Sequence, residues 1–290
     1  MDDNKNITKK INVLHLFEMA AGPSIQTYFY KKFGYGKSWI LSKDRKHPVV
    51  DFYGEVEKFP KIRDVIIEGL KRCKKNDIDI VFIHGSEFAV PIFKIFTRKK
   101  VILQYHGSDI NLPSRSKNIF RILFRSMSDA IIYNQKEHLK NIITIKEVRK
   151  EYHPNTVDTD HFYPLHKKRK GSLTIISNNL NKEKTLEGLK EFSDLKIIDK
   201  QEKKIPYEEM PNLLNQYETY VDYKVTDFGM LLKALSRTAL EALACGCKVY
   251  HDGKIISELP LEHKPEIVIK KLYTLLYFVL TGEEFNSKMN

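Results

Sequence analysis

The stretch IDIVFIHGSEFAVPIFKIFTRKKVILQYHGSD, residues 78–109, carries the clearest secondary-structure pattern of this chain. It contains two apolar runs, 78–83 and 101–105, and each run is followed by a His-Gly-Ser sequence. The residues between the runs have a helical pattern as far as Phe96. A strand, a helix and a second strand in this order predict a βαβ unit, whose strands lie parallel in one sheet.

The same alternation continues on both sides of this stretch. Before it, an apolar run at 11–17 predicts a strand, Ser24 is a candidate cap for the helix that follows, and 62–74 has a helical pattern. After it, 129–133 predicts another buried strand, followed by a helix up to about residue 148. Strands that alternate with helices predict an α/β fold, in which helices cover both faces of a parallel sheet.

A change of composition after Pro154 predicts a domain boundary, because residues 158–171 contain few apolar side chains. Beyond it the alternation restarts, with expected strands at 173–177, 195–198, 219–222 and 248–250, and expected helices at 184–192, after 206 and at 238–245. We therefore expect two Rossmann-like domains facing across a cleft, over residues 1–165 and 166–290. The final helical stretch, 266–277, is a candidate to pack back on the first domain.

The charge of the chain narrows the class of partner. Its 290 residues include 49 Lys and Arg against 37 Asp and Glu, a formal charge of +12. An anionic partner is therefore expected, and a nucleotide-bearing substrate, an anionic lipid and nucleic acid all qualify. The basic residues are scattered in short groups, without the aromatic signatures of RNA-binding modules or helix-turn-helix spacing. We therefore do not expect nucleic acid to be the partner.

Neither a membrane span nor a secretory signal is predicted. No apolar stretch reaches about 18 residues, and the first ten residues are mostly polar and charged. We therefore expect a cytoplasmic protein. The three cysteines, Cys73, Cys245 and Cys247, are too few for a disulfide scaffold and are expected to be reduced.

The string LSRTALEALACGCKVY, residues 235–250, is the strongest candidate for a binding site. A helix that begins near Thr238 would offer the backbone amides of Thr238, Ala239 and Leu240, and the positive end of its dipole, to a diphosphate. Glu241 lies one turn further on; its simplest interpretation is an acid that favours the helix dipole. Cys245-Gly-Cys247 has a spacing that suggests metal, but Gly246 fits better as the turn between helix and strand.

Four segments, in order, resemble the retaining glycosyltransferases of family 4, the glycosyl transferases group 1, which have the GT-B fold. The segments are HGSD at 106–109, NTVD at 155–158 with Phe162 and Pro164 behind it, PYEEMP at 206–211, and the string at 235–250. The resemblance implies a hexosyltransferase-like enzyme of glycan biosynthesis that takes a sugar from a nucleotide diphosphate sugar. It also implies a glycan or lipid-linked acceptor on residues 1–165, and no metal or other cofactor.

The resemblance also assigns roles to donor-site residues. It implies that the Glu241 carboxylate accepts both hydroxyls of the donor's ribose. The family has a phosphate-binding arginine where this chain has Asn179, whose amide can donate a hydrogen bond but carries no charge. Lys184 is therefore expected to neutralise more of the diphosphate, helped by Lys182. A solvated lysine in a polar loop is the alternative for Lys184.

A second departure from the family concerns the acid that contacts the donor sugar. The family places a glutamate where this chain has Lys233. Asp227, followed by Phe-Gly, resembles the displaced acid, and we expect it to contact the sugar. An aspartate in a turn before Gly229 is an equally good interpretation.

The first domain contributes candidates at the ends of its predicted strands. His84 and His106 each follow such a strand, and ligands gather at the carboxyl ends of parallel strands. The resemblance places His106 near the transferred sugar, and Gly22 in a loop that closes over the phosphates and acceptor. Buried structural histidines are the alternative. Asp158-Thr-Asp160 has the DxD spacing of a manganese site, but we interpret it as part of the interdomain linker.

Two other functions and a membrane contact stay open at this point. A sugar-binding or nucleotide-binding protein that lost catalysis would explain the two replaced charges, and a nucleotide-sugar epimerase shares the GT-B fold. The segment 116–127 mixes apolar and basic side chains. It is typical either of a helix resting on an anionic membrane, here its inner face, or of a core-facing helix with arginines reaching solvent.

Overall fold

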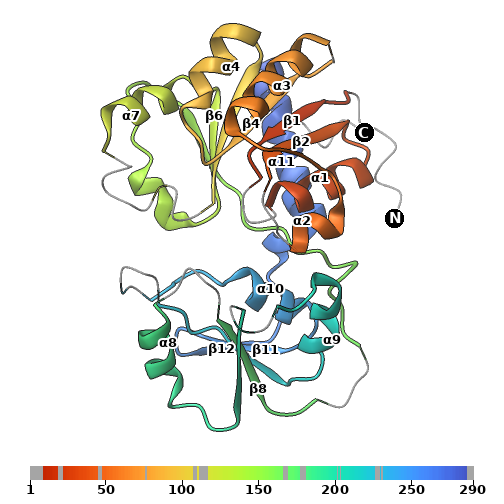
Figure 1. Cartoon of the computed structure of the whole chain (residues 1–290), viewed down its shortest axis with the longest axis vertical. Helices are drawn as coiled ribbons and strands as arrows, with labels where there is room; N and C mark the ends of the chain where they lie inside the picture. The colour runs from red at the N-terminus through yellow and green to blue at the C-terminus, as the bar shows by residue number, and fades with distance from the viewer. Residues whose placement is uncertain are drawn as a thin grey trace. The chain divides into compact units, whose positions relative to one another are not determined.

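The chain divides into two compact units, and each is described by itself. A computed structural model of the chain describes residues 9–18, 22–44, 48–75, 77–106, 110, 117–165, 169–176, 181–200, 202, 204–225, 229 and 231–285. The first unit comprises residues 1–156 and 266–290, and the second comprises residues 157–265. Each unit is built around a mainly parallel sheet (Figure 1).

The first unit contains a parallel sheet with the order β3-β2-β1-β4-β5-β6-β7 among the described residues. Its strands are β1 (Val13–Leu16), β2 (Ser38–Lys43), β3 (Val56–Phe59), β4 (Ile80–His84), β5 (Lys100–Tyr105), β6 (Ala130–Tyr133) and β7 (Arg149–Tyr152). Every neighbouring pair is parallel. The chain builds outward from β1 to β3 and then returns to place β4 on the other side of β1. The strand order therefore reverses between β1 and β4.

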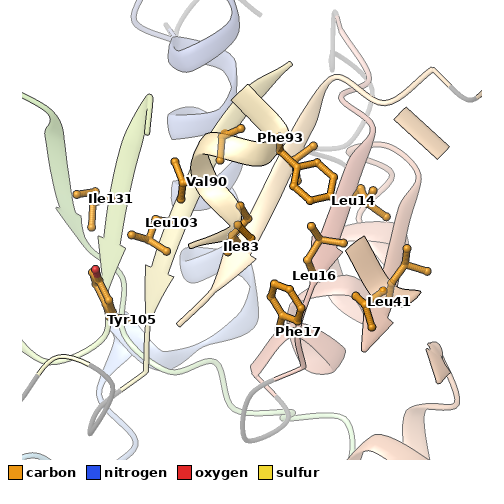
Figure 2. Packing of buried hydrophobic residues seen from close by; sticks show 14 of the residues in the cluster. Leu14, Leu16, Phe17, Leu41, Ile83, Val90, Phe93, Leu103, Tyr105 and Ile131 are labelled. Atoms are coloured by element: carbon orange, nitrogen blue, oxygen red, sulfur yellow. The ribbon is translucent and has the colours of Figure 1, made fainter. Parts of the chain in front are cut away.

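Helices cover both faces of this sheet. They are α1 (Gly22–Lys32), α2 (Pro48–Tyr53), α3 (Ile62–Lys75), α4 (Ala89–Thr97), α7 (Ile119–Ser126) and α11 (Pro265–Thr281), with the 3₁₀ helix η2 (Lys136–Asn141). Figure 2 shows one core, in which Val90 and Phe93 of α4 lie among strand residues such as Leu14, Ile83 and Leu103. The opposite core joins the alternate strand residues to α1 and α11. Both faces are buried, which explains why β4 and β5 are mostly apolar instead of alternating apolar with polar residues.

The last helix, α11, belongs to the first unit, where Figure 1 draws it in blue among red and orange elements. Its Leu272 and Leu276 pack in one core with Phe82 of β4 and Ile102 of β5. The Tyr273 hydroxyl donates to the carbonyl of Lys9 at 2.7 Å. The apolar core on one face of the first sheet therefore includes residues from near the C-terminus.

The second unit contains a sheet with the order β12-β11-β10-β8-β9, in which β12 alone is antiparallel among the described strands. Its strands are β8 (Ser172–Ile176), β9 (Leu195–Asp199), β10 (Thr219–Val221), β11 (Lys248–His251) and β12 (Lys254–Ile256). Its helices are α8 (Lys182–Leu189), α9 (Met210–Leu214) and α10 (Arg237–Ala244), with 3₁₀ helices η3 (Tyr207–Glu209) and η4 (Leu261–His263). Here the strand order reverses between β8 and β10.

Residues 157–165 lie in the second unit, so the boundary at 156 is earlier than the expected 165. The amide of Val157 donates to the carbonyl of His263, and the amide of Leu165 donates to Asn215 Oδ1 at 2.7 Å. These bonds attach both ends of the segment to the second unit.

Two local expectations are wrong. Helix α1 begins at Gly22, so Ser24 lies inside its first turn, and the Ser24 hydroxyl donates to the Glu18 carboxylate at 3.0 Å instead of capping the helix. The expected helix up to residue 148 is the short η2, followed by strand β7. The carbonyls of Asn141 and Ile143 accept hydrogen bonds from the guanidinium of Arg125. Those carbonyls are therefore held by a side chain of α7.

Candidate functional site

The carboxyl edge of the second sheet gathers polar and charged side chains where the strand order reverses. Strand β10 is followed by Asp222 and Lys224, and strand β11 ends at His251. Helix α10 begins at the same edge, because its cap, Ser236, is bonded to Asp222. Ligands of open α/β sheets bind outside the carboxyl ends of the strands at such a reversal. This edge is the candidate site.

Glu241 of α10 is a buried acid, 4% exposed. Among the described residues, none donates a hydrogen bond to its carboxylate. Burial raises the pKa of Glu241 to about 7, and the nearby cations Arg237 and Lys200 offset burial only in part. A buried carboxyl group without donors is costly, so it needs a ligand or a proton to satisfy it.

The first turn of α10 presents fewer amides than the sequence predicted. The amide of Ala239 donates to Ser236 Oγ at 3.3 Å, and the amide of Leu240 donates to the Ser236 carbonyl. The amide of Thr238 has no acceptor among the described residues. The cap thus occupies two of the three predicted amides and leaves Thr238 as the donor available to an anion.

A buried ionic network supports this helix end. Asp222 accepts the amide of Ser236 at 2.9 Å and its hydroxyl at 2.6 Å. The Lys224 ammonium lies 3.2 Å from Asp222 Oδ1 and donates to Ser236 Oγ at 2.7 Å. His251 Nδ1 lies 3.2 Å from Asp222 Oδ2, and its Nε2 donates to the carbonyl of Lys233. The network fixes the start of α10 to the ends of β10 and β11.

The network carries more positive than negative charge. Burial by itself would raise the pKa of Asp222, but the Lys224 ammonium and hydrogen bonds from His251 and Ser236 hold that pKa well below its usual range. The hydrogen bond to Asp222 raises the pKa of His251 to about 9. At neutral pH two cations therefore face one carboxylate, which favours an anion at this edge.

Two lysines at the start of α8 differ in their partners. The Lys182 ammonium forms ion pairs with Asp199 at 2.5 Å and with Glu202 at 3.3 Å. The Lys184 ammonium has no ion-pair partner among the described residues, and it lies beside Gly229. Lys184 is thus the cation of this helix that is available to a ligand.

Asn179 and Asp227 lie outside the described residues, as do Gly107, Ser108 and Asp109 of the HGSD segment. Gly229, two residues after Asp227, has a φ of +75°, a left-handed conformation that favours glycine.

The first unit places a chain of histidines at the reversal point of its own sheet. His84 is the last residue of β4, and its ring lies between His15 of β1 and His106, which follows β5. Neighbouring rings share hydrogen bonds, each 2.9 Å between nitrogens. Gly22 is the first residue of α1, and it is buried.

Two candidate metal motifs have structural roles. Asp158 Oδ1 accepts the amides of Asp160 and His161, so this aspartate organises a turn. Gly246 has a φ of +79° directly after α10, which confirms the predicted turn between helix and strand. Within the part of the chain that the structure describes, no three His, Cys, Asp or Glu side chains are grouped as a metal would require.

Sequence reasoning predicted roles for Glu241 and Lys184 but did not point to the network around Asp222. Asp222, Lys224 and His251 match no motif and are far apart in sequence. A polar residue at or just beyond the end of a predicted strand, as Asp222 and His251 are, is the signal that could have found them.

Comparison with known proteins identifies the fold. No protein-family model and no curated protein matches the sequence. Among solved structures, Anabaena HepE in complex with UDP and glucose is similar over 83% of this chain and 80% of its own, with 11% identity and a TM-score of 0.58. A glycosyltransferase from Rickettsia africae is similar over 83% and 79%, with 14% identity and a TM-score of 0.55.

A third similar structure is the UDP-GlcNAc 2-epimerase of Neisseria meningitidis bound to UDP-GlcNAc. It covers 96% of this chain and 95% of its own, with 13% identity and a TM-score of 0.51. No helix among the described residues has the length and apolar character needed to cross a bilayer. The two parallel-sheet units and these likenesses confirm the predicted fold class, a GT-B protein with two Rossmann-like units.

Proposed function

We propose that this protein is a glycosyltransferase that moves a sugar from a nucleoside diphosphate sugar, which it holds on the carboxyl edge of the second sheet. Glu241 is the observation that carries the proposal. Its buried carboxylate lacks donors among the described residues, and the two hydroxyls of a ribose are donors of the right kind. If Glu241 served only to interact favourably with the helix dipole, its carboxylate would not need to be buried.

The diphosphate is expected at the start of α10. The Thr238 amide, the positive end of the helix and the excess charge of the Asp222 network all favour an anion there. Lys184 has no competing ion pair among the described residues and supplies a further charge. These groups would also stabilise the charge that grows on the leaving diphosphate, a role that bound metal has in other transferases. We propose a metal-independent reaction for this reason.

The remaining roles rest on the resemblance to family 4. We propose that Asp227 contacts the donor sugar, that Asn179 donates to a phosphate oxygen, and that His106 lies near the transferred sugar. Gly22, at the start of α1, is assigned to the loop that meets the acceptor. Transfer with retention of configuration, a glycan or lipid-linked acceptor and a cytoplasmic location belong to the same proposal.

A peripheral membrane contact is proposed for α7. Its Ile119 and Phe120 are 63% and 66% exposed, whereas Arg125 is fully buried. Arg121 donates to the buried Glu87 at 2.9 Å. The arginines thus face the protein and the apolar side chains face solvent, which is the reverse of a core-facing helix. An exposed apolar helix face, on a chain with a formal charge of +12, suits the surface of an anionic membrane.

Titration with UDP and uridine tests the proposed donor site, since UDP is present in the similar HepE structure. We expect Glu241→Gln to weaken both ligands about tenfold or more, because both carry the ribose. A UDP analogue without ribose hydroxyls should lose affinity for the wild type but not for the variant. Wild-type affinity should also rise with pH through about 7, as the Glu241 carboxyl ionises and becomes a better acceptor.

The same variant is expected to bind ligand more weakly but to be more stable than the wild type when no ligand is bound. Because burial raises the pKa of Glu241 from 4.5 to about 7, the native state holds this proton more tightly than the unfolded state. The resulting cost grows as pH rises from 4.5 to 7 and is complete above 7. Glu241→Gln should therefore raise the free energy of unfolding at pH 8 by up to about 3 kcal/mol, with no gain at pH 4.

Glu87→Gln is the matched control. Glu87 is equally buried, but Tyr105 and Arg121 donate to its carboxylate. This variant should lose stability and bind UDP as the wild type does. If no nucleoside diphosphate binds the wild type, or if Glu241→Gln binds UDP unchanged, the proposed donor site is wrong.

Incubation with labelled UDP-sugars separates the competing functions. A transferase hydrolyses the donor or passes the sugar to an acceptor, whereas an epimerase changes the sugar with no acceptor present. The epimerase is retained as the second candidate because the similar Neisseria enzyme covers nearly the whole chain. A protein that binds the donor and changes nothing would be a binding protein on the same fold.

A further inference from the structure

Three histidines of the first unit form one continuous hydrogen-bonded chain. His15 Nδ1 lies 2.9 Å from His84 Nε2, and His84 Nδ1 lies 2.9 Å from His106 Nε2. The rings of His15 and His84 stack at an interplanar angle of 15°, and Phe82 stacks on both. Both nitrogens of His84 are therefore used within the chain.

His15 and His84 are both buried and neutral. His15 is 2% exposed and His84 is fully buried. Burial lowers the pKa of His15 to about 3. Burial, with the adjacent His106 and His15, also holds the pKa of His84 well below its usual range. A neutral imidazole has one N–H donor and one acceptor nitrogen, so each ring must donate on one side and accept on the other.

When all three rings are neutral, the two hydrogen bonds between them can therefore both form in only two arrangements. In the first, His15 Nδ1–H donates to His84, His84 Nδ1–H donates to His106, and His106 carries its hydrogen on Nδ1. In the second, both bonds run the other way, and His106 Nδ1 is an acceptor. A mixed arrangement would bring two donors or two acceptors together across one of the bonds. The three tautomers must change together.

We propose that His15 and His84 are positioning residues that set the tautomer of His106, and that the three rings act as a proton relay. When a proton joins His106 Nδ1, His106 Nε2–H passes its proton to His84 Nδ1. His84 Nε2–H then passes its proton to His15 Nδ1, and His15 Nε2–H releases a proton to water. One proton enters and one leaves, and the chain passes from the second arrangement to the first.

The position of the chain suits this role. His15 and His84 lie on β1 and β4, the strands between which the strand order of the first sheet reverses. Ligands of such sheets bind at this place. The relay would let His106 donate to, or accept from, a sugar hydroxyl without holding a charge there. This use of the relay rests on the proposed function, whereas the coupling of the tautomers does not.

Nitrogen-15 NMR of the histidine rings tests the coupling. His15→Leu removes a ring that does not bond His106, so a change at His106 must pass through His84. We expect the ratio of the two His106 tautomers to change by about threefold to tenfold, the equivalent of one neutral hydrogen bond. Phe82→Leu is the matched control, because Phe82 stacks on His15 and His84 without bonding either. His138, a buried histidine outside the chain, should stay unchanged in both variants.

A second measurement needs no variant. Two-bond couplings between the nitrogens of neighbouring rings should be visible across both hydrogen bonds of the wild-type protein. An unchanged His106 spectrum in folded His15→Leu, or the absence of either coupling, would overturn the inference. UDP binding reports separately on the donor site: lost UDP affinity with intact histidine coupling would overturn the proposed function alone.

Discussion

The carboxyl edges of the two sheets each include a reversal of strand order, but they differ in charge. In the second unit the strand reversal carries buried ions, with Asp222 between Lys224 and His251. In the first unit the corresponding place carries a hydrogen-bonded chain of histidine rings from His15 to His106, in which burial keeps His15 and His84 neutral. A buried ionic edge suits an anionic ligand, whereas a chain of neutral imidazoles suits the exchange of protons. The same reversal of strand order thus presents two different chemical environments, set by a few side chains at the strand ends.

The largest expected effect tests the charged edge. Asp222→Asn leaves the Lys224 ammonium buried without a carboxylate, and removal of one partner from a buried pair costs about 3–5 kcal/mol of unfolding free energy. Chemical denaturation measures this loss. Glu57→Gln, which removes a half-exposed partner of Arg72, should cost under about 1 kcal/mol. Equal losses would show that the Asp222 network contributes no more to the free energy of unfolding than a half-exposed ion pair does.

An intermediate effect separates the two lysines of α8. Lys184→Ala should weaken UDP about tenfold and leave uridine nearly unchanged, because the ammonium is expected to contact phosphate and not ribose. Lys182→Ala should change neither ligand by more than about twofold, since Asp199 and Glu202 already hold that ammonium. Calorimetric titration of both variants decides the matter. An equal loss for UDP and uridine would remove Lys184 from the phosphate site.

The smallest expected effect concerns the contribution of the exposed apolar side chains of α7, in the first unit, to membrane binding. Phe120→Ser combined with Leu123→Ser should reduce co-sedimentation with anionic vesicles about fivefold, the equivalent of about 1 kcal/mol of lost apolar burial. Leu261→Ser removes an equally exposed apolar side chain from the second unit and should have no effect. If wild-type protein stays in the supernatant at low salt, α7 has no direct membrane role.

The sequence predicts strands well where both faces of a sheet are buried, as in β4 and β5, because most of their residues are apolar. It misses the inner strand β2, although SWILSK is largely apolar, and the edge strands β3, β7 and β12. The sequences of β3 and β7, VEKF and RKEY, are typical of a polar surface. Those edge strands are held by backbone bonds to a neighbour, which leave no apolar pattern in the sequence.

The residues of the candidate site are likewise predictable only where neighbouring residues in the sequence form a pattern. Glu241 stands in a continuous motif on one helix, so its position is readable from neighbouring residues. The Asp222 network and the histidine chain are assembled from separate strands, and each member by itself resembles an ordinary surface charge or core histidine. His15 in particular lies within an apolar strand and gives no local signal. The contacts that define these clusters exist only after the sheets have formed.

The position of α11 has a consequence for how the protein is made. The first unit needs residues 266–290, yet the whole second unit leaves the ribosome before them. Until α11 is synthesised, apolar side chains such as Phe82, Ile102 and Ile132 lack the cover that α11 gives to that face of the nascent sheet. The second unit can therefore fold first during translation, while the unfinished first unit offers an apolar surface to chaperones.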